Sequence, residues 1–424
     1  MNTNKLKLAI IGLGYVGLPL AVEFAKNRPV KGYDKNIQRI KELKLGIDKT
    51  LEINGGKFKS IKNLDFFAEL DEIKSCNCFI ITVPTPITKK NKPDLSFLLK
   101  ATKDVGKILK PNDIVIYEST VYPGCTEEKC VPLLESVSGL RYNNDFFCGY
   151  SPERINPGDK NHTIRDIKKI VSGSNKKVTS IIDSLYREII DAGTYKVNSI
   201  IVAEAAKVIE NTQRDLNIAL LNELSIIFDK LKINTSEVIS AAKTKWNFMP
   251  FLPGLVGGHC IGVDPYYLTH KAEKLGYKAK IILAGRKLNN NMSSHVVNKF
   301  IKHLKIKKKK FKDVKVLLLG LTFKENCPDL RNSKIKDIFE KLKNKNLKID
   351  LYDPLADSKE IKSYYGKKQI SKFLFNKYDG IIISVPHKKI KSMGINFIKS
   401  LCKDNHVIFD LKSVFNKKYS NFQL

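Results

Sequence analysis

A short glycine-rich segment near the N-terminus most constrains how this chain can fold. The apolar run Lys7–Ile11 leads into Gly12-Leu-Gly-Tyr-Val-Gly17, and a helix-like stretch continues through Lys26. A second apolar run, Pro29–Tyr33, ends at Asp34. A G-x-G-x-x-G pattern between a strand and a helix, with an acidic residue about 20 positions on, is typical of a dinucleotide-binding βαβ unit. The segment therefore predicts a parallel sheet that binds a nucleotide at its carboxyl edge.

The residue types of this segment predict which dinucleotide binds. Gly12, Gly14 and Gly17 permit a tight turn and let a pyrophosphate approach the helix N-terminus, where N–H groups and the helix dipole favour anions. Asp34 can accept hydrogen bonds from ribose hydroxyls and would repel a 2′-phosphate. NAD is therefore the expected cofactor, rather than NADP.

Two further strands end in residues that would face the same crevice. Cys78–Val83 is followed by Pro84-Thr85-Pro86, and Ile114–Tyr117 by Glu118-Ser119-Thr120. Open α/β sheets bind ligands at the carboxyl ends of their strands. Thr85 and Thr120 are therefore candidate cofactor contacts.

A loop that is rich in proline and glycine, residues 148–158, carries two charged candidates. Glu153 is a plausible base and Arg154 a plausible anion contact. The alternative is an exposed ion pair on a loop.

One long helix without proline or glycine is predicted from Ser199 to about Leu231. Glu204, Lys207, Asn211 and Arg214 recur at spacings of three and four, which places them on one face. Burying such a polar stripe without partners is costly, so we expect it to face water, a partner subunit or a polar ligand. Lys207 and Asn211 can donate to a developing oxyanion. A structural ion-pair stripe is the alternative.

The segment Pro250–Tyr267 has the features of a catalytic loop. Cys260 follows the pair Gly257-Gly258, and Asp264 lies four residues further on. A thiolate is a strong nucleophile, and a nearby carboxylate can orient water or take a proton. A buried, inert cysteine beside a tight turn is the alternative. A zinc site is not expected, because no further cysteine or histidine accompanies His259 and Cys260 at ligand spacing.

The last third of the chain repeats the first in outline, after a lysine-rich segment, residues 302–312, that is expected to be a solvated linker. Val314–Leu319 matches the opening strand, and Leu347–Tyr352 with Asp353 matches the strand before Asp34. Residues 380–386 and 407–410 match the next two strands.

The glycine turn is not repeated. Gly12 has a counterpart in Gly320, but Thr322 and Glu325 stand at the positions of the other two glycines. Lys324, Asp329 and Arg331 are the charged residues of the new segment. We therefore expect a second nucleotide site that holds phosphates with side chains.

Length and composition set the remaining limits. The 424 residues allow two or three domains, and no apolar run is long enough to cross a membrane. The formal net charge of +32 comes mainly from lysine. Arginine and interleaved aromatic residues would be expected for nucleic-acid readout, so no nucleic-acid partner is expected. The eight cysteines are scattered, which favours a reducing cytoplasm.

The motifs together resemble those of the nucleotide-sugar C6 dehydrogenase family, which includes UDP-glucose, GDP-mannose and UDP-N-acetylhexosamine dehydrogenases. The resemblance covers essentially the whole chain. It is carried by Gly12–Gly17, Val83–Thr85, Glu118–Thr120, Ser151–Arg154, Ala206–Asn211, Gly257–Cys260 with Asp264, and Phe323–Arg331. It implies an α/β protein with two Rossmann-like doubly wound domains (residues 1–198 and 306–424). A central helical domain (199–305) with one long helix joins them and forms a homodimer or a higher homo-oligomer.

The resemblance also implies roles for single residues. Cys260 would trap a C6 aldehyde as a thiohemiacetal, and a thioester formed from it would be hydrolysed. Lys207 and Asn211 would stabilise oxyanions, while Asp264, Thr120 and Glu153 would handle protons and water. Implied cofactor contacts are Gly12, Gly14, Tyr15, Val16, Gly17, Asp34, Arg39, Thr85, Thr120 and Arg331. Implied UDP-sugar contacts are Arg154, Ile155, Lys207, Asn211, Arg214, Gly254, Phe323, Lys324 and Lys412.

Two departures narrow the expected substrate. UDP-glucose dehydrogenases usually carry a lysine directly before the aspartate that follows the catalytic cysteine, where this chain has Val263. They often carry a second glutamate where this chain has Pro157. The loops resemble those of UDP-N-acetylglucosamine and UDP-N-acetylgalactosamine 6-dehydrogenases that serve capsule or O-antigen synthesis.

Three other functions stay open. A UDP-N-acetylmannosamine or UDP-glucose 6-dehydrogenase would differ in substrate alone. A two-electron β-hydroxyacid dehydrogenase would need neither Cys260 nor the last domain, and would release one NADH per substrate. A basic nucleotide- or RNA-binding scaffold would bind RNA in a salt-dependent way without Cys260.

Overall fold

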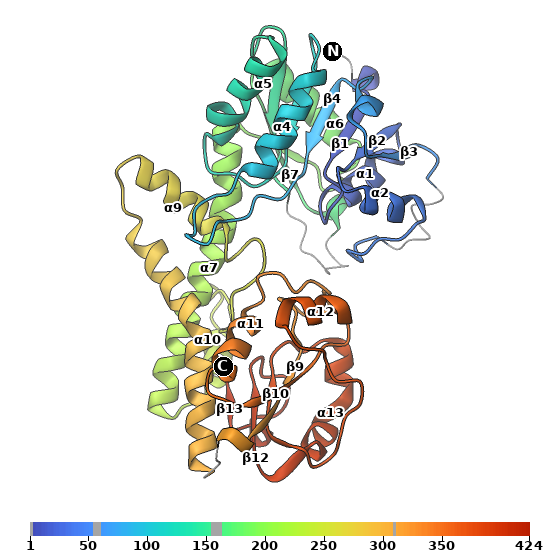
Figure 1. Ribbon diagram of the computed structural model, residues 1–424. Helices are drawn as coiled ribbons and strands as arrows, with labels where there is room; N and C mark the ends of the chain where they lie inside the picture. The colour runs from blue at the N-terminus through green and yellow to red at the C-terminus, as the bar shows by residue number, and fades with distance from the viewer. Residues whose placement is uncertain (1–2, 54–60, 154–162, 308–310) are drawn as a thin grey trace. The chain divides into compact units, whose positions relative to one another are not determined.

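The computed structural model describes residues 3–53, 61–153, 163–307 and 311–424 (Figure 1). The chain divides into two compact units, Met1–Asn211 with Val263–Lys278, and Thr212–Gly262 with Ala279–Leu424. The domain boundaries expected after residues 198 and 305 remain a prediction. The structure confirms an α/β protein with two sheets and a helical region between them in the sequence.

The first unit is built on an eight-stranded sheet in the order β3-β2-β1-β4-β5-β6-β7-β8. Among the strands of this sheet that the structure describes, only β6 and β7 pair antiparallel. The first six positions follow the strand order of dinucleotide-binding folds. The strands are β1 Leu8–Ile11, β2 Val30–Tyr33, β3 Leu64–Phe67, β4 Cys78–Ile81, β5 Ile114–Tyr117, β6 Phe147–Tyr150, β7 Lys169–Gly173 and β8 Thr194–Lys196.

Helices cover both faces of this sheet, so its central strands are apolar throughout rather than alternating. Ile80 and Ile116 pack in one core with Leu18 and Ile182, whereas Phe79 and Val115 pack in a second core with the helices of the other face. The helices are α1 Gly17–Ala25, α2 Ile37–Lys44, α4 Ser96–Ile108, α5 Val131–Ser138, α6 Lys176–Arg187 and α9 Asp264–Lys274. Short helical turns are Thr3–Lys5, Leu70–Ile73, Thr126–Cys130 and Ile164–Asp166.

The second unit contains a parallel sheet in the order β10-β9-β11-β12-β13, the order of β2-β1-β4-β5-β6 in the first unit. The predicted repeat is therefore confirmed. Its strands are β9 Lys315–Leu319, β10 Lys348–Tyr352, β11 Tyr378–Ile383, β12 Cys402–Asp410 and β13 Phe422–Gln423. Its helices are α11 Lys334–Lys343, α12 Ser358–Tyr365 and α13 Lys388–Ser400, with short turns Phe311–Asp313 and Lys417–Tyr419.

The helical region contains α7 Ile200–Leu231, α8 Thr235–Ala242 and α10 Lys280–Ile306 (Figure 1). The predicted long helix is confirmed by the 32 residues of α7. The expectation of a solvated linker from residue 302 is wrong for its first part, because α10 continues to Ile306 and buries Leu304. No helix within the described ranges is long and apolar enough to cross a membrane.

Candidate active site

The glycine turn of the first unit lies between β1 and α1. Gly12 has a φ of 93°, in the left-handed region that favours glycine. A Cβ at Gly17 would lie 1.9 Å from the carbonyl oxygen of Gly12, so turn and helix are too close for a side chain. A Cβ at Gly14 would meet nothing within 4 Å, and the half-buried Tyr15 and Val16 complete the turn. The turn therefore leaves open space for a pyrophosphate beside the first N–H groups of α1.

Asp34 and Arg39 both brace this turn. The Asp34 carboxylate accepts the Leu13 N–H, and Arg39 Nε donates to the Leu13 carbonyl oxygen, each at 2.9 Å. Arg39 also donates to Asp48, at 2.8 Å. Asp34 is half-buried at the carboxyl end of β2, where a ribose is expected to lie. The predicted ribose contacts of both residues remain predictions.

Thr85 and Thr120 follow β4 and β5, which are neighbours in the sheet. Both residues are half-buried at its carboxyl edge, as the sequence predicts. The segment around Thr85 is held from α9, since the Tyr267 hydroxyl donates to the Pro86 carbonyl oxygen at 3.0 Å.

Glu153 belongs to a buried cluster of three charges. Lys169 Nζ lies 2.7 Å from Glu153 Oε2 and 2.8 Å from Glu118 Oε2. The Tyr186 hydroxyl donates to the other oxygen of Glu118. Burial raises the pKa of Glu118 to about 7, against the opposing effect of Lys169. The alternative of an exposed ion pair is wrong for Glu153, while Arg154 and Ile155 lie outside the described residues.

Three of the four residues in the polar stripe of α7 are buried, and for Glu204 the structure corrects the expectation that the stripe faces water, a partner subunit or a polar ligand. Glu204 accepts the N–H groups of Gly124 and Thr126, at 2.5 and 2.9 Å. It therefore anchors the turn before a short helix and does not face water or a ligand. Lys207 is also buried, and Arg214 is half-buried. The pattern of three and four residues predicted one shared face, but not which neighbours cover that face.

Asn211 and Asp264 meet within the first unit. Asn211 Nδ2 donates to Asp264 Oδ2 at 2.6 Å, and both side chains are buried. Asp264 is the first residue of α9, and Asn211 lies one turn after Lys207 on α7. The structure thus brings two predicted catalytic residues into direct contact.

Cys260 lies in a turn of the second unit and is exposed, whereas the other seven cysteines are buried. Burial raises the pKa of Cys76 to about 11 and that of Cys402 to about 12, which keeps these thiols protonated and inert. The alternative of a buried Cys260 is therefore wrong.

The glycines before Cys260 let its loop pack closely on residues 323–332. A Cβ at Gly257 would lie 2.6 Å from the Asn332 carbonyl oxygen, and one at Gly258 would lie 2.7 Å from the Phe323 ring. Gly258 also has a φ of 82°. The next residue, His259, contacts Asp329 with 3.1 Å between Nε2 and Oδ2. The predicted substrate residue Phe323 therefore packs against the loop that carries Cys260.

The Asp329 carboxylate lies between the His259 imidazole and the Arg331 guanidinium. Burial alone would raise its pKa, but hydrogen bonds from His259 and Arg331 lower the pKa of Asp329 below its ordinary value. Arg331 Nη2 lies 2.6 Å from Asp329 Oδ2, with most of the arginine side chain exposed. Its predicted cofactor contact remains a prediction.

Gly254 is fixed at the N-terminal end of the loop that carries Cys260. Its N–H donates to Asn222 Oδ1 at 2.8 Å, and its carbonyl oxygen accepts from Asn222 Nδ2 at 3.0 Å. Asn289 on α10 in turn accepts from Asn222, at 2.8 Å. A Cβ at Gly254 would lie 2.7 Å from Lys412 Nζ. Two predicted substrate residues, Gly254 and Lys412, are therefore adjacent.

Three buried residues whose hydrogen bonds hold the candidate site segments together were not predicted from the sequence. They are Lys169, Asn222 and His387. No sequence pattern distinguishes Lys169 or Asn222 from the surrounding polar residues. His387 could have been found, because it follows Val385-Pro386 as Thr85 follows Val83-Pro84 in the first half. No group of three potential metal ligands occurs in the described parts of the chain.

The first unit has the fold and glycine turn of NAD-dependent dehydrogenases, and the second repeats the fold without that turn. Comparison with protein families gives the same class. Three models of the UDP-glucose/GDP-mannose dehydrogenase family match: the NAD binding domain at residues 6–190, the central domain at 201–291 and the UDP binding domain at 317–417. The chain belongs to this family and is an NAD-binding dehydrogenase.

Individual relatives match over nearly their full length. The chain is 56% identical to a UDP-N-acetyl-D-glucosamine 6-dehydrogenase of Pseudomonas aeruginosa, over 99% of both chains. It is 55% identical to the enzyme of that name from Salmonella typhi, again over 99% of both. Among solved structures, a UDP-D-ManNAc dehydrogenase from Pyrococcus horikoshii matches with a TM-score of 0.88, 29% identity and coverage of 97% of this chain and 96% of that one.

Proposed function

We propose that this protein is a UDP-N-acetylhexosamine 6-dehydrogenase that acts on UDP-N-acetylglucosamine and oxidises its C6 hydroxyl to a carboxylate. The observation that carries the proposal is the 56% identity to a UDP-N-acetyl-D-glucosamine 6-dehydrogenase over 99% of both chains. UDP-N-acetylgalactosamine is the second candidate, since the loops resemble those of the 6-dehydrogenases for both sugars.

Cys260 is the proposed nucleophile. Its thiol adds to the C6 aldehyde, so that an S–C bond forms and the carbonyl oxygen takes a proton to give a thiohemiacetal. Bound NAD would supply the oxidising chemistry by accepting a hydride from C6 in each of the two oxidations. Water then attacks the resulting thioester, the C–S bond breaks, and the uronate leaves with the thiol restored. The exposed position of Cys260 supports this assignment.

The buried residues of α7 and α9 are proposed to stabilise charge at C6. Lys207 and Asn211 would donate to the oxyanion that forms at each stage, and Asp264 would orient Asn211 or the attacking water. The hydrogen bond between Asn211 and Asp264 supports a joint role. Glu153 and Thr120 would handle protons at the carboxyl edge of the first sheet.

The UDP-sugar is proposed to contact residues near the catalytic loop in the second unit. Phe323, Gly254 and Lys412 contact this loop or belong to it, which supports their assignment. Lysine at positions 324 and 412 would pair with the diphosphate, as expected for side-chain recognition without a glycine turn. Arg214, Arg154 and Ile155 are assigned on the family resemblance alone.

A homodimer through α7 is proposed. Val202, Ile209, Leu220, Ile227 and Leu231 are all exposed by 43% or more. At 100° per residue these five side chains fall within about 20° of one line along the helix. An exposed apolar stripe of this kind is typical of a helix that packs against another copy. Light scattering after size-exclusion chromatography is expected to give at least twice the 48.1 kDa chain mass.

The proposed reaction is tested with a panel of UDP-sugars. The purified protein is mixed with NAD and a limiting amount of UDP-N-acetylglucosamine, UDP-N-acetylgalactosamine, UDP-N-acetylmannosamine or UDP-glucose. NADH formation is followed by its absorbance. We expect two NADH per UDP-N-acetylglucosamine and a uronate by mass spectrometry. One NADH per sugar, or preference for UDP-glucose, would contradict the proposal. We also propose that the enzyme works in the cytoplasm and that its uronic acid product is used for surface polysaccharide.

A further inference from the structure

The acidic residue after the second strand has a different role in each half of the chain. Asp34 is half-buried and accepts two backbone N–H groups. Asp353, its counterpart after β10, is buried and accepts the N–H groups of Leu321, Leu355 and Ala356 at 2.6, 2.9 and 3.0 Å. Burial alone would raise the pKa of Asp353, but the hydrogen bonds from His387 and from the backbone lower it below its ordinary value. The Asp353 carboxylate therefore forms its hydrogen bonds within the protein, and its burial keeps it from contacting a ribose.

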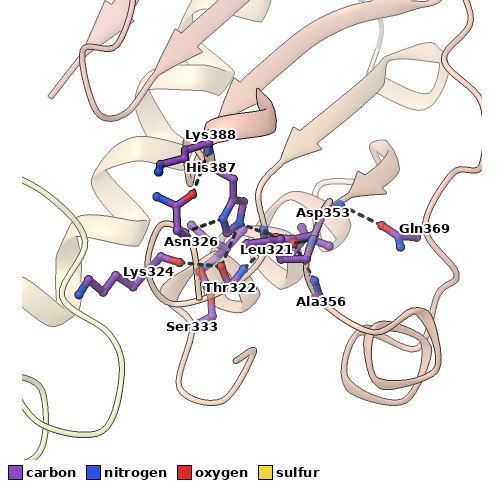
Figure 2. Close-up of polar contacts among 12 residues, drawn as sticks. Leu321, Thr322, Lys324, Asn326, Ser333, Asp353, Ala356, Gln369, His387 and Lys388 are labelled. Atoms are coloured by element: carbon purple, nitrogen blue, oxygen red, sulfur yellow. Dashed lines mark hydrogen bonds and ion pairs between the residues drawn. The ribbon is translucent and has the colours of Figure 1, made fainter. Parts of the chain in front are cut away.

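His387 connects this carboxylate to the loop that replaces the glycine turn. Its Nδ1 accepts the Asn326 N–H at 2.9 Å, so Nδ1 carries no proton and Nε2 carries one. Nε2 lies 3.0 Å from Asp353 Oδ2 and 3.1 Å from Thr322 Oγ1 (Figure 2). The buried imidazole is thus a neutral bridge with a hydrogen-bond partner on each side.

The loop from Gly320 to Asn326 packs closely on the segment that carries His387. A Cβ at Gly320 would lie 2.2 Å from the Val385 carbonyl oxygen. Asn326 has a φ of 57°, which asparagine tolerates better than most residues, and its Oδ1 accepts the Lys388 N–H at 2.9 Å. The two ends of the loop are therefore fixed to the segment after β11.

Two further hydrogen bonds fix the backbone around Lys324. The Thr322 hydroxyl, which faces His387 Nε2, donates to the Lys324 carbonyl oxygen at 2.9 Å. Ser333 donates to the Thr322 carbonyl oxygen at 3.1 Å. Figure 2 shows the side chain of Lys324 pointing away from this cluster. Because the backbone of Lys324 is fixed, its side chain leaves the loop in a set direction, and only the side-chain torsions remain to be ordered on binding.

We propose that His387 is a positioning residue for the nucleotide of the UDP-sugar. By bridging Asp353, Thr322 and Asn326 it holds the loop in the shape that presents Lys324, and so takes over the function of the missing glycines. The position equivalent to His387 in the first half is Thr85, at the cofactor edge of the sheet. The proposal rests on the proposed role of Lys324 in substrate binding.

Substitutions at His387 test this role with the full-length protein. Calorimetric titration measures the affinities for UDP and for NAD, and thermal unfolding reports folding. We expect His387→Ala to weaken UDP binding about tenfold, the loss expected for one or two hydrogen bonds, with NAD binding unchanged. His387→Gln keeps a donor near Nε2 and His387→Asn keeps an acceptor near Nδ1, so both are expected to lie between wild type and alanine. These variants also serve if alanine prevents folding.

His406→Ala is the matched control. His406 is a half-buried histidine of β12 that contacts the Lys403 carbonyl oxygen at 2.7 Å and has no contact with the loop in the described structure. Its substitution is expected to leave UDP affinity unchanged. Equal UDP affinity in wild type and all three His387 variants would overturn the positioning role. So would a parallel loss of UDP and NAD binding, which would indicate general destabilisation. Failure of wild type to bind UDP would instead contradict the proposed function.

Discussion

Asn211 on α7 and Asp264 at the start of α9 form a buried hydrogen bond with 2.6 Å between Nδ2 and Oδ2. Since a carboxylate only accepts hydrogen bonds, the contact fixes the orientation of the Asn211 amide. An oriented amide is able to donate its second N–H without reorganisation when charge develops on a substrate oxygen. The pair therefore combines a role in stability with its proposed role in catalysis.

Exchanging the amide of Asn211 and the carboxylate of Asp264 tests the role of the pair in stability separately from its proposed role in catalysis. Asn211→Asp places two carboxylates in contact in a buried site, so we expect the free energy of unfolding to fall by about 3 kcal/mol. Asn211→Asp with Asp264→Asn restores one donor and one acceptor and should recover most of that loss. Urea denaturation measures both. Asn217→Asp, on a half-buried part of α7, is the control. Equal instability of the single and double variants would show that the pair is not a direct interaction.

The buried carboxyl group of Glu204 makes stability depend on pH. Burial raises the pKa of Glu204 from 4.5 to about 7, although N–H donors oppose the shift. The folded state then binds a proton more tightly than the unfolded chain. Stability from this group is therefore complete below about pH 4.5 and is lost as the pH rises to about 7. Glu118, with its raised pKa, acts in the same direction.

Glu204→Gln removes one of these titrating groups. We expect the decrease in unfolding free energy between pH 4.5 and 7 to be smaller than in wild type by on the order of 2 to 3 kcal/mol. Denaturant unfolding at a series of pH values measures the difference. Glu273→Gln, an exposed substitution on α9, is the control. Parallel curves for wild type and Glu204→Gln would contradict the raised pKa.

Two glycines of the catalytic loop are expected to respond differently to alanine. At Gly257 the new methyl group meets a backbone oxygen, that of Asn332, so Gly257→Ala should lower the unfolding temperature by disturbing the contact between two loops. At Gly254 the methyl group meets the end of the long Lys412 side chain, which can turn aside. Gly254→Ala should therefore keep the free energy of unfolding within about 0.5 kcal/mol of wild type. Displacing Lys412 should nevertheless raise the KM for the UDP-sugar. An unchanged KM in Gly254→Ala would remove Lys412 from the proposed substrate site.

The fold was largely predictable because its signals are local. The glycine turn requires a strand before it and a helix after it, and continuous apolar runs such as Ile114–Tyr117 are required when both faces of a sheet are covered. The repeat of strand and acidic residue, seen at Asp34 and Asp353, predicted the second sheet. The linker expected from residue 302 begins later, because the lysines after that position continue α10, whose other face is buried.

The site was predictable only in part, because burial and partners depend on distant segments. Position in a motif indicated Cys260, Asn211 and Asp264 as candidate site residues, but it did not predict the hydrogen bond between Asn211 and Asp264. Position did not predict that Glu204 accepts N–H groups from Gly124 and Thr126, 80 and 78 residues away. Nor did it predict that Lys169 neutralises Glu153, because the two meet only across neighbouring strands of the folded sheet.

Cys260 carries the central claim, and its substitution tests that claim most directly. Wild type and Cys260→Ala are incubated with NAD and UDP-N-acetylglucosamine, and the products are separated and identified by mass spectrometry. Cys402→Ala, at a buried cysteine, is the control. If the thiol holds the half-oxidised sugar, Cys260→Ala forms no uronate while Cys402→Ala forms it as wild type does. Uronate formation by Cys260→Ala at the wild-type rate would contradict the account.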